Sequence, residues 1–433
     1  MSTSKRVAVI GAGWAGLSAA MAATDCGHRV SVFEASSQLG GRARSLPVSL
    51  PNGETVCLDN GQHILIGAYH RTLAWMRRMG LERNDVFHDM PLALVFPDGK
   101  GLRLPNWPQP LDALAGVLTA RGWSTADKWS FLRTVLGWRL RGFTCDPDTT
   151  VITLCQDLSP RLLAEVIEPL CVSALNTPAE CASASVFLRV LQDSLLGPGD
   201  SSHLLLPTTD LGMLLPEPAQ HWLVQRGAQV HLGRRVTTLM HSADSWLVNG
   251  QPFDAVILAA SASHALSLLT ETQRGIEPTL YQALADWLAR AGALRFEAIA
   301  TVYAWAADAQ LSSPLLALRS HPVSAPAQFV FDRGQLKGPP GLLAFVVSAS
   351  CGTKEALQTA VLEQAQAQLG LKLLAVTTVV EKRATFACTP GLVRPWAQVL
   401  PGLLACGDYV DGPYPATLEG AVRSGETAAL LLG

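Results

Sequence analysis

The sequence predicts an α/β fold in which a Rossmann-type domain is interleaved with a second, α+β domain. Three observations support this prediction. A glycine-rich turn near the N-terminus joins an apolar run to an Ala/Leu-rich segment, apolar strand patterns return at 228–259 and 402–406, and two long excursions of different composition separate these parts. At 433 residues the chain is also long for a single domain.

The first thirty-five residues carry the pattern that organises the chain. An apolar strand is followed by a G-x-G-x-x-G turn, a helix, a second strand and an acid; in order these are Val7–Ile10, the glycines Gly11, Gly13 and Gly16, Leu17–Cys26, Arg29–Phe33 and Glu34. In dinucleotide-binding units such glycines permit a tight turn, a close approach of the pyrophosphate and close packing of helix on strand. The helix N-terminus offers free N–H groups to a phosphate, and the acid can accept hydrogen bonds from ribose hydroxyls. An acid here argues against a 2′-phosphate, so we expect NAD or FAD rather than NADP.

Two polar turns follow this unit. Gly40-Gly41-Arg42 places a flexible backbone and a cation directly behind Glu34, near the phosphates of the same nucleotide; the alternative is a surface turn with solvated arginines. The second turn is Asp59-Asn60-Gly61-Gln62-His63. His63 at this point is more simply a hydrogen-bonded loop histidine than an acid–base catalyst.

The C-terminal segment distinguishes between the two dinucleotides. A short apolar strand ends at Gly407-Asp408, and a helix begins near Leu418. An acid after a strand can hold a polyol hydroxyl, and a helix N-terminus favours negative charge. FAD has a ribityl polyol between its pyrophosphate and its redox ring, and the reduced ring carries negative charge at its N1/C2=O edge, whereas NAD has no such polyol. FAD is therefore the expected cofactor.

Composition limits the classes of partner and compartment. The net charge is 33 − 35 = −2, so no overall positive field would attract nucleic acid. The nine cysteines form no C-x-x-C and no Cys/His cluster, which predicts reduced, mostly buried thiols in a cytoplasmic protein and no metal site. No apolar run reaches the roughly 18–20 residues of a membrane span. We therefore expect a soluble protein, or one attached to a membrane surface.

The segment 107–141 differs from its surroundings. A helix is expected over Thr125–Leu140, with an apolar stripe at Trp129, Leu132, Leu136 and Leu140, and five basic residues against one acid lie between Arg121 and Arg141. Tryptophans at 107, 123, 129 and 138 add amphipathic rings. This combination suits a segment that lies on a membrane surface at the mouth of an apolar tunnel. A core-packed helix with a solvated basic face is the alternative, and the sequence leaves both open.

The remaining pattern gives the expected elements and domains. Helices are expected at Tyr69–Met79, 159–195 with a break at 175–178, 218–226, 278–291 and Lys354–Leu369; strands are expected at Ala228–Leu232, Val236–His241, Ser245–Val248, Asp254–Ala259, Phe296–Trp305, Gln328–Asp332, Leu342–Ser348 and Val376–Arg383. On this basis residues 1–90, 200–262 and 384–433 form the cofactor domain. Residues 91–199 and 263–383 form the substrate domain, whose apolar interior suits a greasy molecule.

Taken together, these motifs resemble the FAD-dependent amine oxidase and carotenoid desaturase superfamily from one end of the chain to the other. The resemblance implies that Glu34 binds the adenosine ribose, Gly41 and Arg42 the pyrophosphate, the Val236 backbone the adenine, Asp408 the ribityl chain, and Leu418 and Glu419 the pyrimidine edge of the flavin. The cofactor-binding set is Gly11, Gly13, Trp14, Ala15, Gly16, Glu34, Ala35, Gly40, Gly41, Arg42, Gly61, Gln62, His63, Val236, Gly407, Asp408, Thr417, Leu418 and Glu419.

Within that superfamily the middle of the chain is similar to the hydroxysqualene dehydroxylases, also called squalene-associated FAD-dependent desaturases. The stretches that carry this similarity are 59–63, Ala174-Leu175-Asn176-Thr177-Pro178, Phe187-Leu188-Arg189-Val190-Leu191 and 413–421. The resemblance implies reduction of a C30 allylic alcohol in hopanoid biosynthesis, an electron donor outside this chain, and a general acid for the leaving water. His63 and Asp210 are the candidate acids, because each lies in a polar segment flanked by apolar sequence.

Two alternatives to this function remain at the level of sequence. Oxidative desaturation of a carotenoid or squalene-like chain would use the same fold, cofactor and pocket with electrons flowing the other way. The GDP-dissociation inhibitors of prenylated GTPases use a related fold without FAD, and the glycine turn, Glu34, Arg42 and Asp408 speak against that class.

Overall fold

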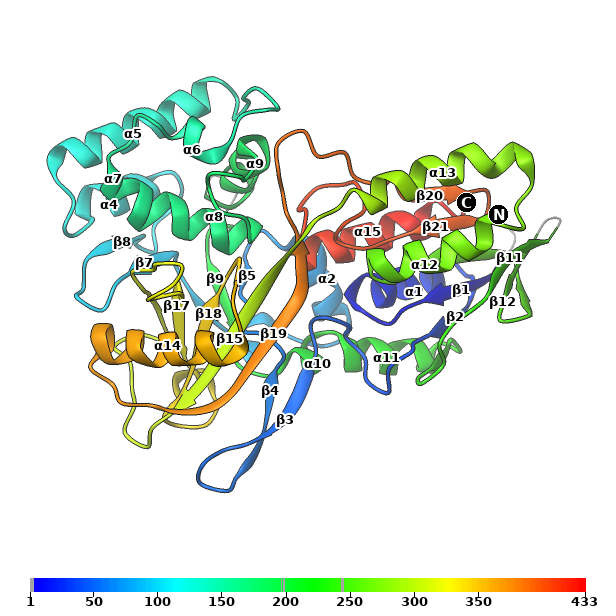
Figure 1. Ribbon diagram of the computed structural model, residues 1–433, viewed down its shortest axis with the longest axis horizontal. Helices are drawn as coiled ribbons and strands as arrows, with labels where there is room; N and C mark the ends of the chain where they lie inside the picture. The colour runs from blue at the N-terminus through cyan, green and yellow to red at the C-terminus, as the bar shows by residue number, and fades with distance from the viewer. Residues whose placement is uncertain (1–3, 196, 198, 243–244) are drawn as a thin grey trace.

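The first domain is built around a six-stranded sheet whose strands come from distant parts of the chain (Figure 1). The computed structural model describes residues 4–195, 197, 199–242 and 245–433. The strand order is β10-β2-β1-β14-β21-β20. The bounds are β1 (Arg6–Ile10), β2 (Arg29–Phe33), β10 (Gln229–His231), β14 (Ala255–Leu258), β20 (Gln398–Leu400) and β21 (Leu403–Ala405). The first five strands in this order pair in parallel, and β20 is antiparallel at one edge. The predicted Rossmann-type sheet is confirmed.

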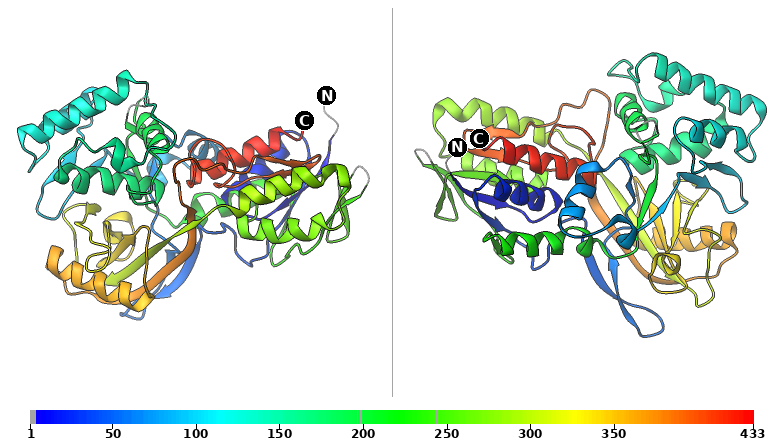
Figure 2. Two further views of the ribbon diagram at one scale, coloured as in Figure 1. Left: turned by 45° about the horizontal axis from the view of Figure 1, so that its top comes forward. Right: turned by 180° about the vertical axis from the view of Figure 1, so that it is seen from behind.

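Both faces of this sheet are covered, which explains why its strands are continuously apolar. Val7, Val9 and Ile257 pack with α1 (Trp14–Asp25) and α15 (Leu418–Leu430). Ala8 and Val256 belong to the opposite face. There they meet α12 (Ala262–Gln273), α13 (Pro278–Gly292) and a small sheet of β11 (Leu239–Ser242), β12 (Ser245–Val248) and β13 (Gln251–Phe253). Figure 2 shows the helices of the two sides flanking the sheet.

The close crossing of α15 over α1 depends on small residues. A Cβ on Gly425 would lie 2.2 Å from the carbonyl oxygen of Ala15. The Ser18 hydroxyl donates to the carbonyl of Val422 at 2.8 Å. The C-terminal helix is therefore fixed against the helix that follows the glycine turn.

The second domain contains a five-stranded antiparallel sheet of order β16-β17-β18-β15-β19. Its strands are β15 (Phe296–Trp305), β16 (Leu315–Ala317), β17 (Phe329–Asp332), β18 (Leu342–Val347) and β19 (Leu374–Phe386). Alternation along β15 sends Ala300 and Val302 towards α14 (Lys354–Leu369) and Tyr303 towards the other face. The long strands β15 and β19 run from this sheet to the first domain (Figure 1).

A helical lobe covers the remaining side of the second domain. It contains α4 (Leu111–Thr119), α5 (Thr125–Leu140), α6 (Val151–Leu154), α7 (Pro160–Leu162), the π-helix η1 (Leu163–Ile167), α8 (Glu168–Leu175) and α9 (Ala184–Leu195). The predicted break at 175–178 is confirmed, because Asn176 adopts a left-handed conformation and ends α8. Its amide donates to the Thr385 hydroxyl at 2.9 Å, and its oxygen accepts from the Ala349 N–H at 2.6 Å. One side chain thus ties the lobe to the second-domain sheet.

The shorter elements connect the two domains. They are the hairpin β3 (Ser45–Ser49) and β4 (Thr55–Asp59), the pair β7 (Ala93–Val95) and β8 (Gly101–Arg103), the sheet β5 (Leu65–Ile66), β9 (Leu204–Pro207) and β6 (Phe87–Met90), the helices α2 (His70–Arg78), α3 (Arg83–Val86), α10 (Leu211–Leu214) and α11 (Pro216–Gln225), and the 3-10 turn η2 (Arg333–Leu336). In the described part of the chain, every helix is too short or too polar to cross a bilayer.

Several expected boundaries differ from the structure. Helix α1 begins at Trp14 rather than Leu17, and the strand expected from Val236 begins only at Leu239. The Asn249 side chain accepts from the N–H groups of Thr237 and Thr238, at 2.9 and 3.2 Å, in place of strand pairing. The sequence pattern also did not predict α12. Both α12 and α13 pack on the side of the first-domain sheet. We therefore propose that residues 262–292 belong to the first domain, although the sequence placed 263–383 in the second.

The expectation of mostly buried thiols is also wrong. All nine cysteines lie within the described residues and are free, but Cys26, Cys57, Cys181 and Cys351 are exposed. The four buried thiols are those of Cys155, Cys171, Cys388 and Cys406, and burial raises the pKa of each.

Candidate functional site

The glycine turn contains two glycines that the protein itself requires and one that it does not. A Cβ on Gly11 would lie 2.6 Å from the carbonyl oxygen of Ala259, and one on Gly16 would lie 1.9 Å from the carbonyl oxygen of Gly11. At Gly13 the nearest described protein atoms would be 3.9 Å away. Side-chain crowding therefore explains Gly11 and Gly16, whereas the space in front of Gly13 is open for a ligand to approach the backbone.

The N-terminus of α1 faces the same space. Among the described residues, no side chain caps this helix at Gly13, and its first turn carries no acid. The first N–H groups of a helix need partners, and a phosphate can provide them. The backbone and charge at this end suit an anionic ligand.

The turn at Gly40 and Gly41 packs directly on the glycine turn. The Gly40 N–H donates to the carbonyl of Ala12 at 2.9 Å, and a Cβ on Gly41 would lie 3.3 Å from the Cα of Gly13. Two motifs that are separate in sequence thus form one backbone cradle. Trp14 is buried behind it and donates from its indole to the carbonyl of Ala43 at 3.3 Å.

Glu34 lies at the end of β2, as expected, and orders the loops around it. Its carboxylate accepts from the N–H groups of Ala12 at 2.7 Å and Ser36 at 2.8 Å. Its backbone pairs with the loop that leads to Val236, because the Arg234 N–H donates to the Glu34 carbonyl at 2.8 Å. Ala35 is exposed beside it. The residues assigned to adenosine are therefore brought together.

Arg42 and Asp408 form an ion pair across the site. Asp408 is buried, and the Arg42 guanidinium also donates to the carbonyl of Ala384 at the end of β19. Gly407, directly before Asp408, donates from its N–H to the Ser424 hydroxyl at 3.1 Å. The sequence assigned Arg42 and Asp408 to different parts of the cofactor, and the structure places them in contact.

The turn 59–63 is fixed to the second-domain sheet. The Gln62 N–H donates to the Thr301 hydroxyl, and its side-chain oxygen accepts from Arg333, both at 3.3 Å. The imidazole Nδ1 of His63 is 2.7 Å from the carbonyl oxygen of Gly61. Burial, and secondarily the Arg42 charge, lower the pKa of His63, so its ring is neutral near pH 7.

Asp59, at the start of this turn, has an unusual environment. Burial raises the pKa of its carboxyl from 3.8 to about 7, while the Leu211 N–H and Arg333 act in the opposite direction. The carboxylate accepts from Leu211 N–H at 2.8 Å, and the Tyr303 hydroxyl donates to the Asp59 carbonyl at 2.9 Å. A buried carboxyl that titrates near neutrality is typical of functional sites. The sequence motif contains both residues, but only the tertiary structure shows that burial raises the pKa of Asp59 and lowers that of His63.

Asp210, the other predicted acid, serves as a helix cap. Its carboxylate accepts from the Met213 N–H at 3.3 Å and from the Ser45 hydroxyl. The first contact caps α10, and the second fixes the start of α10 to the hairpin strand β3. The structure therefore gives Asp210 a local structural role.

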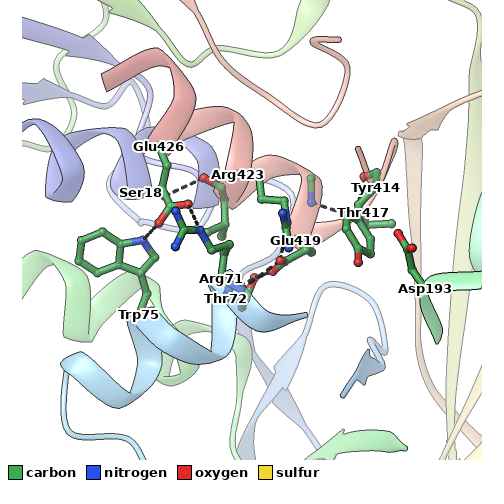
Figure 3. A network of polar contacts seen from close by, with 12 residues as sticks. Ser18, Arg71, Thr72, Trp75, Asp193, Tyr414, Thr417, Glu419, Arg423 and Glu426 are labelled. Atoms are coloured by element: carbon green, nitrogen blue, oxygen red, sulfur yellow. Dashed lines mark hydrogen bonds and ion pairs between the residues drawn. The ribbon is translucent and has the colours of Figure 1, made fainter. Parts of the chain in front are cut away.

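The N-terminus of α15 is held by a polar network (Figure 3). Thr417 caps the helix by accepting from the Gly420 N–H at 3.0 Å. The Glu419 carboxylate is fully buried and accepts from the backbone N–H groups of Arg71 at 3.0 Å and Thr72 at 2.9 Å. It also accepts from Arg423 at 2.7 Å. Glu419 thus caps α2 from another helix, and its side chain is occupied by that role, so contact with a flavin would involve its backbone.

The loop before α15 is strained. Tyr414 and Ala416 have φ values of 57° and 59°, a region that costs about 1–2 kcal/mol for residues other than glycine. The Tyr414 ring contacts Tyr69 edge to face, and the Arg423 guanidinium lies 4.9 Å from the Tyr414 ring centre. Such strain persists only where the surroundings enforce it, and it occurs often at ligand sites. Leu418, the first residue of α15, follows this loop directly.

Comparison with known proteins agrees with this geometry. The family model described as flavin containing amine oxidoreductase matches residues 14–432. A hydroxysqualene dehydroxylase of Zymomonas mobilis is 28% identical, and the match covers 97% of this chain and 97% of the relative. A hydroxysqualene dehydroxylase of Rhodopseudomonas palustris is 29% identical, and the match covers 99% of this chain and 98% of the relative. An oxidoreductase structure from Methanosarcina mazei superposes with a TM-score of 0.73 at 16% identity, covering 98% of this chain and all of that one. The predicted fold, flavin cofactor and resemblance are confirmed, and this chain belongs to the family of flavin-containing amine oxidoreductases, as an FAD-dependent enzyme.

Proposed function

We propose that this enzyme reduces hydroxysqualene to squalene. The observation that carries the proposal is the similarity, over nearly the whole chain, to relatives that are named hydroxysqualene dehydroxylase. In this reaction the allylic C–O bond breaks, the oxygen leaves as water, and a C–H bond forms at the same carbon. Bound reduced FAD would supply the hydride, so that one alcohol and one FADH₂ would give one alkene, one water and one FAD. A reductant outside this chain then has to reduce the FAD again.

The cradle described above would hold the FAD. Gly13 and the first turn of α1 would bind the pyrophosphate, and Glu34 with the Val236 loop would bind adenosine. Asp408 would accept from ribityl hydroxyls, beside its partner Arg42. The backbone N–H groups of Leu418 and Glu419 would face the pyrimidine edge, where the N-terminus of α15 favours negative charge.

Loss of a hydroxyl as water requires a proton, and we propose that Asp59 is the general acid that donates it. A general acid works best when its pKa is near the working pH. The pKa of Asp59 is raised to about 7, so a large share of this carboxyl is protonated at neutral pH. His63 is neutral there and Asp210 caps α10, which makes both poorer donors. In this proposal Asp59 takes the role for which His63 and Asp210 were the candidates from sequence.

A single anaerobic turnover tests the reaction itself. The holoenzyme is reduced with dithionite, excess reductant is removed, and hydroxysqualene is added while flavin absorbance is followed and the extracted lipid is identified by mass spectrometry. We expect one squalene for each flavin reoxidised. If hydroxysqualene is recovered unchanged and the flavin stays reduced, the proposal is wrong. Squalene and phytoene offered to the oxidised enzyme would then test the opposite direction of electron flow, oxidative desaturation.

The role of Asp59 is tested separately in the same assay. We expect Asp59→Asn to slow flavin reoxidation by 100-fold or more, on the order of general-acid catalysis, with FAD content retained. The wild-type rate should fall as pH rises through about 7, and this dependence should be absent in the variant. Asp210→Asn, matched in chemistry, should keep the low-pH rate and shift the pH profile to lower pH, because the Asp210 charge is one of the causes that raise the pKa of Asp59. Equal rates for wild type and Asp59→Asn would exclude Asp59 while leaving the overall reaction intact.

A further inference from the structure

Exposed large apolar side chains are concentrated in one short part of the chain. Among the described residues, seventeen such side chains are exposed, and seven of them fall between 107 and 140: Trp107, Leu111, Leu114, Leu118, Trp129, Leu136 and Leu140. Scattered exposed apolar residues are normal, but such a concentration marks an interaction site. We call these seven residues, with the bases around them, the α4–α5 surface. Its two helices lie at the outer end of the helical lobe, away from the first-domain sheet (Figures 1 and 2).

Helix α5 is apolar on two sides, and only one of them is packed. Phe131 and Trp138 are buried beneath the helix. On its other side Trp129 is 73% exposed and Leu140 79% exposed. The core-packed alternative for the stripe is therefore wrong, apart from Leu132, which is half-buried. A helix with this second apolar face lacks a partner within the described chain.

Helix α4 repeats the arrangement. Leu111, Leu114 and Leu118 recur at helical spacing and are exposed, whereas Val117 is buried. Gly116 permits the close packing of α4 on β8, since a Cβ there would lie 2.4 Å from the Leu104 side chain. Both helices thus use one side to attach to the lobe and leave leucines on another.

The charges of this segment are divided between inside and outside. Its two acids, Asp112 and Asp127, are buried, and Asp127 forms a capping box with Ser124 and also accepts from Ser159. Its five basic residues are Arg121, Lys128, Arg133, Arg139 and Arg141. Lys128 is half-buried, and the other four are exposed. Within the described structure none of these five is ion-paired with an acid. The surface is therefore basic although the whole chain has a net charge of −2.

We propose that the α4–α5 surface binds the face of an anionic phospholipid bilayer. Tryptophan and leucine side chains enter the boundary between headgroups and acyl chains, and the bases contact lipid phosphates. Apolar side chains mixed with unpaired cations complement such a surface better than they complement a second copy of this chain, which would bring the same positive charges together. The proposal does not depend on the identity of the substrate.

A hollow of about 830 Å³ borders this surface. Trp107, Pro110, Arg139 and Phe143 line it on the side of the α4–α5 surface, and Gln192 and His203 line it on the other. Bound at a bilayer, the protein would have this hollow next to the acyl chains. Its apolar lining would then face lipid rather than water, and removal of apolar surface from water is favourable.

Vesicle binding by the full-length holoenzyme tests the proposal. The protein is sedimented with vesicles of phosphatidylcholine alone and of phosphatidylcholine with 30% phosphatidylglycerol. We expect binding to the anionic vesicles at least tenfold stronger, and weaker when NaCl is raised to 0.5 M, because salt screens surface charges. Equal binding to both kinds of vesicle, or none to either, overturns the proposal.

Substitutions locate the contact. We expect Trp129→Ser with Leu136→Ser and Leu140→Ser to weaken binding at least tenfold. Arg133→Glu with Arg139→Glu should weaken it at least about 25-fold, given about fivefold for each basic residue lost near the membrane. Matched controls elsewhere are Val323→Ser and Lys354→Glu, both at exposed positions, which should bind like wild type. FAD content and melting temperature confirm that each variant is folded.

Two further outcomes would also overturn the proposal. Unchanged binding in both multiple variants would place the contact elsewhere. A dimer of the wild type in solution that the serine variant converts to monomer would show that a second copy covers this surface instead.

Discussion

Replacing Gly13 by alanine should separate cofactor binding from folding. At this position φ is −76°, which alanine adopts readily, and the new methyl group would be 3.9 Å from the nearest described protein atoms. The free energy of unfolding of the cofactor-free protein should therefore change by less than about 1 kcal/mol. The same methyl group would occupy the space through which a pyrophosphate approaches the backbone.

The expected loss of affinity follows from the contacts at this helix end. Displacing the phosphate removes about two hydrogen bonds from backbone N–H groups to a charged oxygen, each contributing about 1.5–3 kcal/mol. A loss of about 3 kcal/mol corresponds to a Kd that is roughly 100-fold higher. At an FAD concentration of about 100 times the wild-type Kd, FAD should stabilise the wild type by about 2.7 kcal/mol and the variant by about 0.4 kcal/mol.

The assay is titration of cofactor-free protein with FAD by flavin fluorescence, combined with thermal unfolding with and without FAD. Gly275→Ala is the neutral control, because a Cβ there meets open space at an ordinary φ. Gly16→Ala is the opposite control: its Cβ would lie 1.9 Å from a carbonyl oxygen, so it should destabilise the protein even without cofactor. Wild-type FAD affinity in Gly13→Ala would refute the placement of the pyrophosphate, and unfolding of that variant without FAD would refute the packing argument.

Three further predictions concern buried polar groups. Glu419→Ala should lower the free energy of unfolding, measured with urea, by about 3–5 kcal/mol, because it leaves the Arg71 and Thr72 N–H groups of α2 without their acceptor. Glu419→Gln should lower it less. A loss below about 1 kcal/mol in the alanine variant would contradict the capping role. The raised pKa of Asp59 means that the folded state keeps a proton that the unfolded chain releases, so this contribution to stability is present below about pH 4 and is lost as pH rises through about 7, by up to about 4 kcal/mol. Urea unfolding at pH 5 and pH 8 should show about 3 kcal/mol of this decline in the wild type and a flatter profile in Asp59→Asn. Parallel profiles would mean that Asp59 titrates normally. Asn176→Ala should lower the free energy of unfolding by about 2–4 kcal/mol, because two side-chain hydrogen bonds are lost and alanine tolerates the left-handed conformation less well than asparagine. Asn176→Gly, which restores only the backbone freedom, should recover about 1 kcal/mol in the same urea measurement.

Local chemistry made the cofactor elements readable in the sequence. The strands β1 and β2 and the glycines between them follow from apolar runs and from turns that only glycine permits, so their positions appear directly in the residue order. The helices α5 and α14 and the strand β15 have the bounds that their periodicity predicts. These features depend on neighbours within a few residues of one another.

Tertiary contacts decided what the sequence could not. Periodicity found the stripe on α5 but could not tell which of its two apolar sides would be buried, because that depends on where the lobe presents its own core. The polar motif 59–63 is visible in the sequence, but the raised pKa of Asp59 comes from burial between β4, α10 and Arg333, segments more than a hundred residues apart. The family resemblance implied that Glu419 faces the flavin, but its carboxylate caps α2, 347 residues away in sequence. The sequence alone determined the fold class and the position of the glycine turns, whereas the tertiary structure decided which polar groups are buried and which apolar faces remain open.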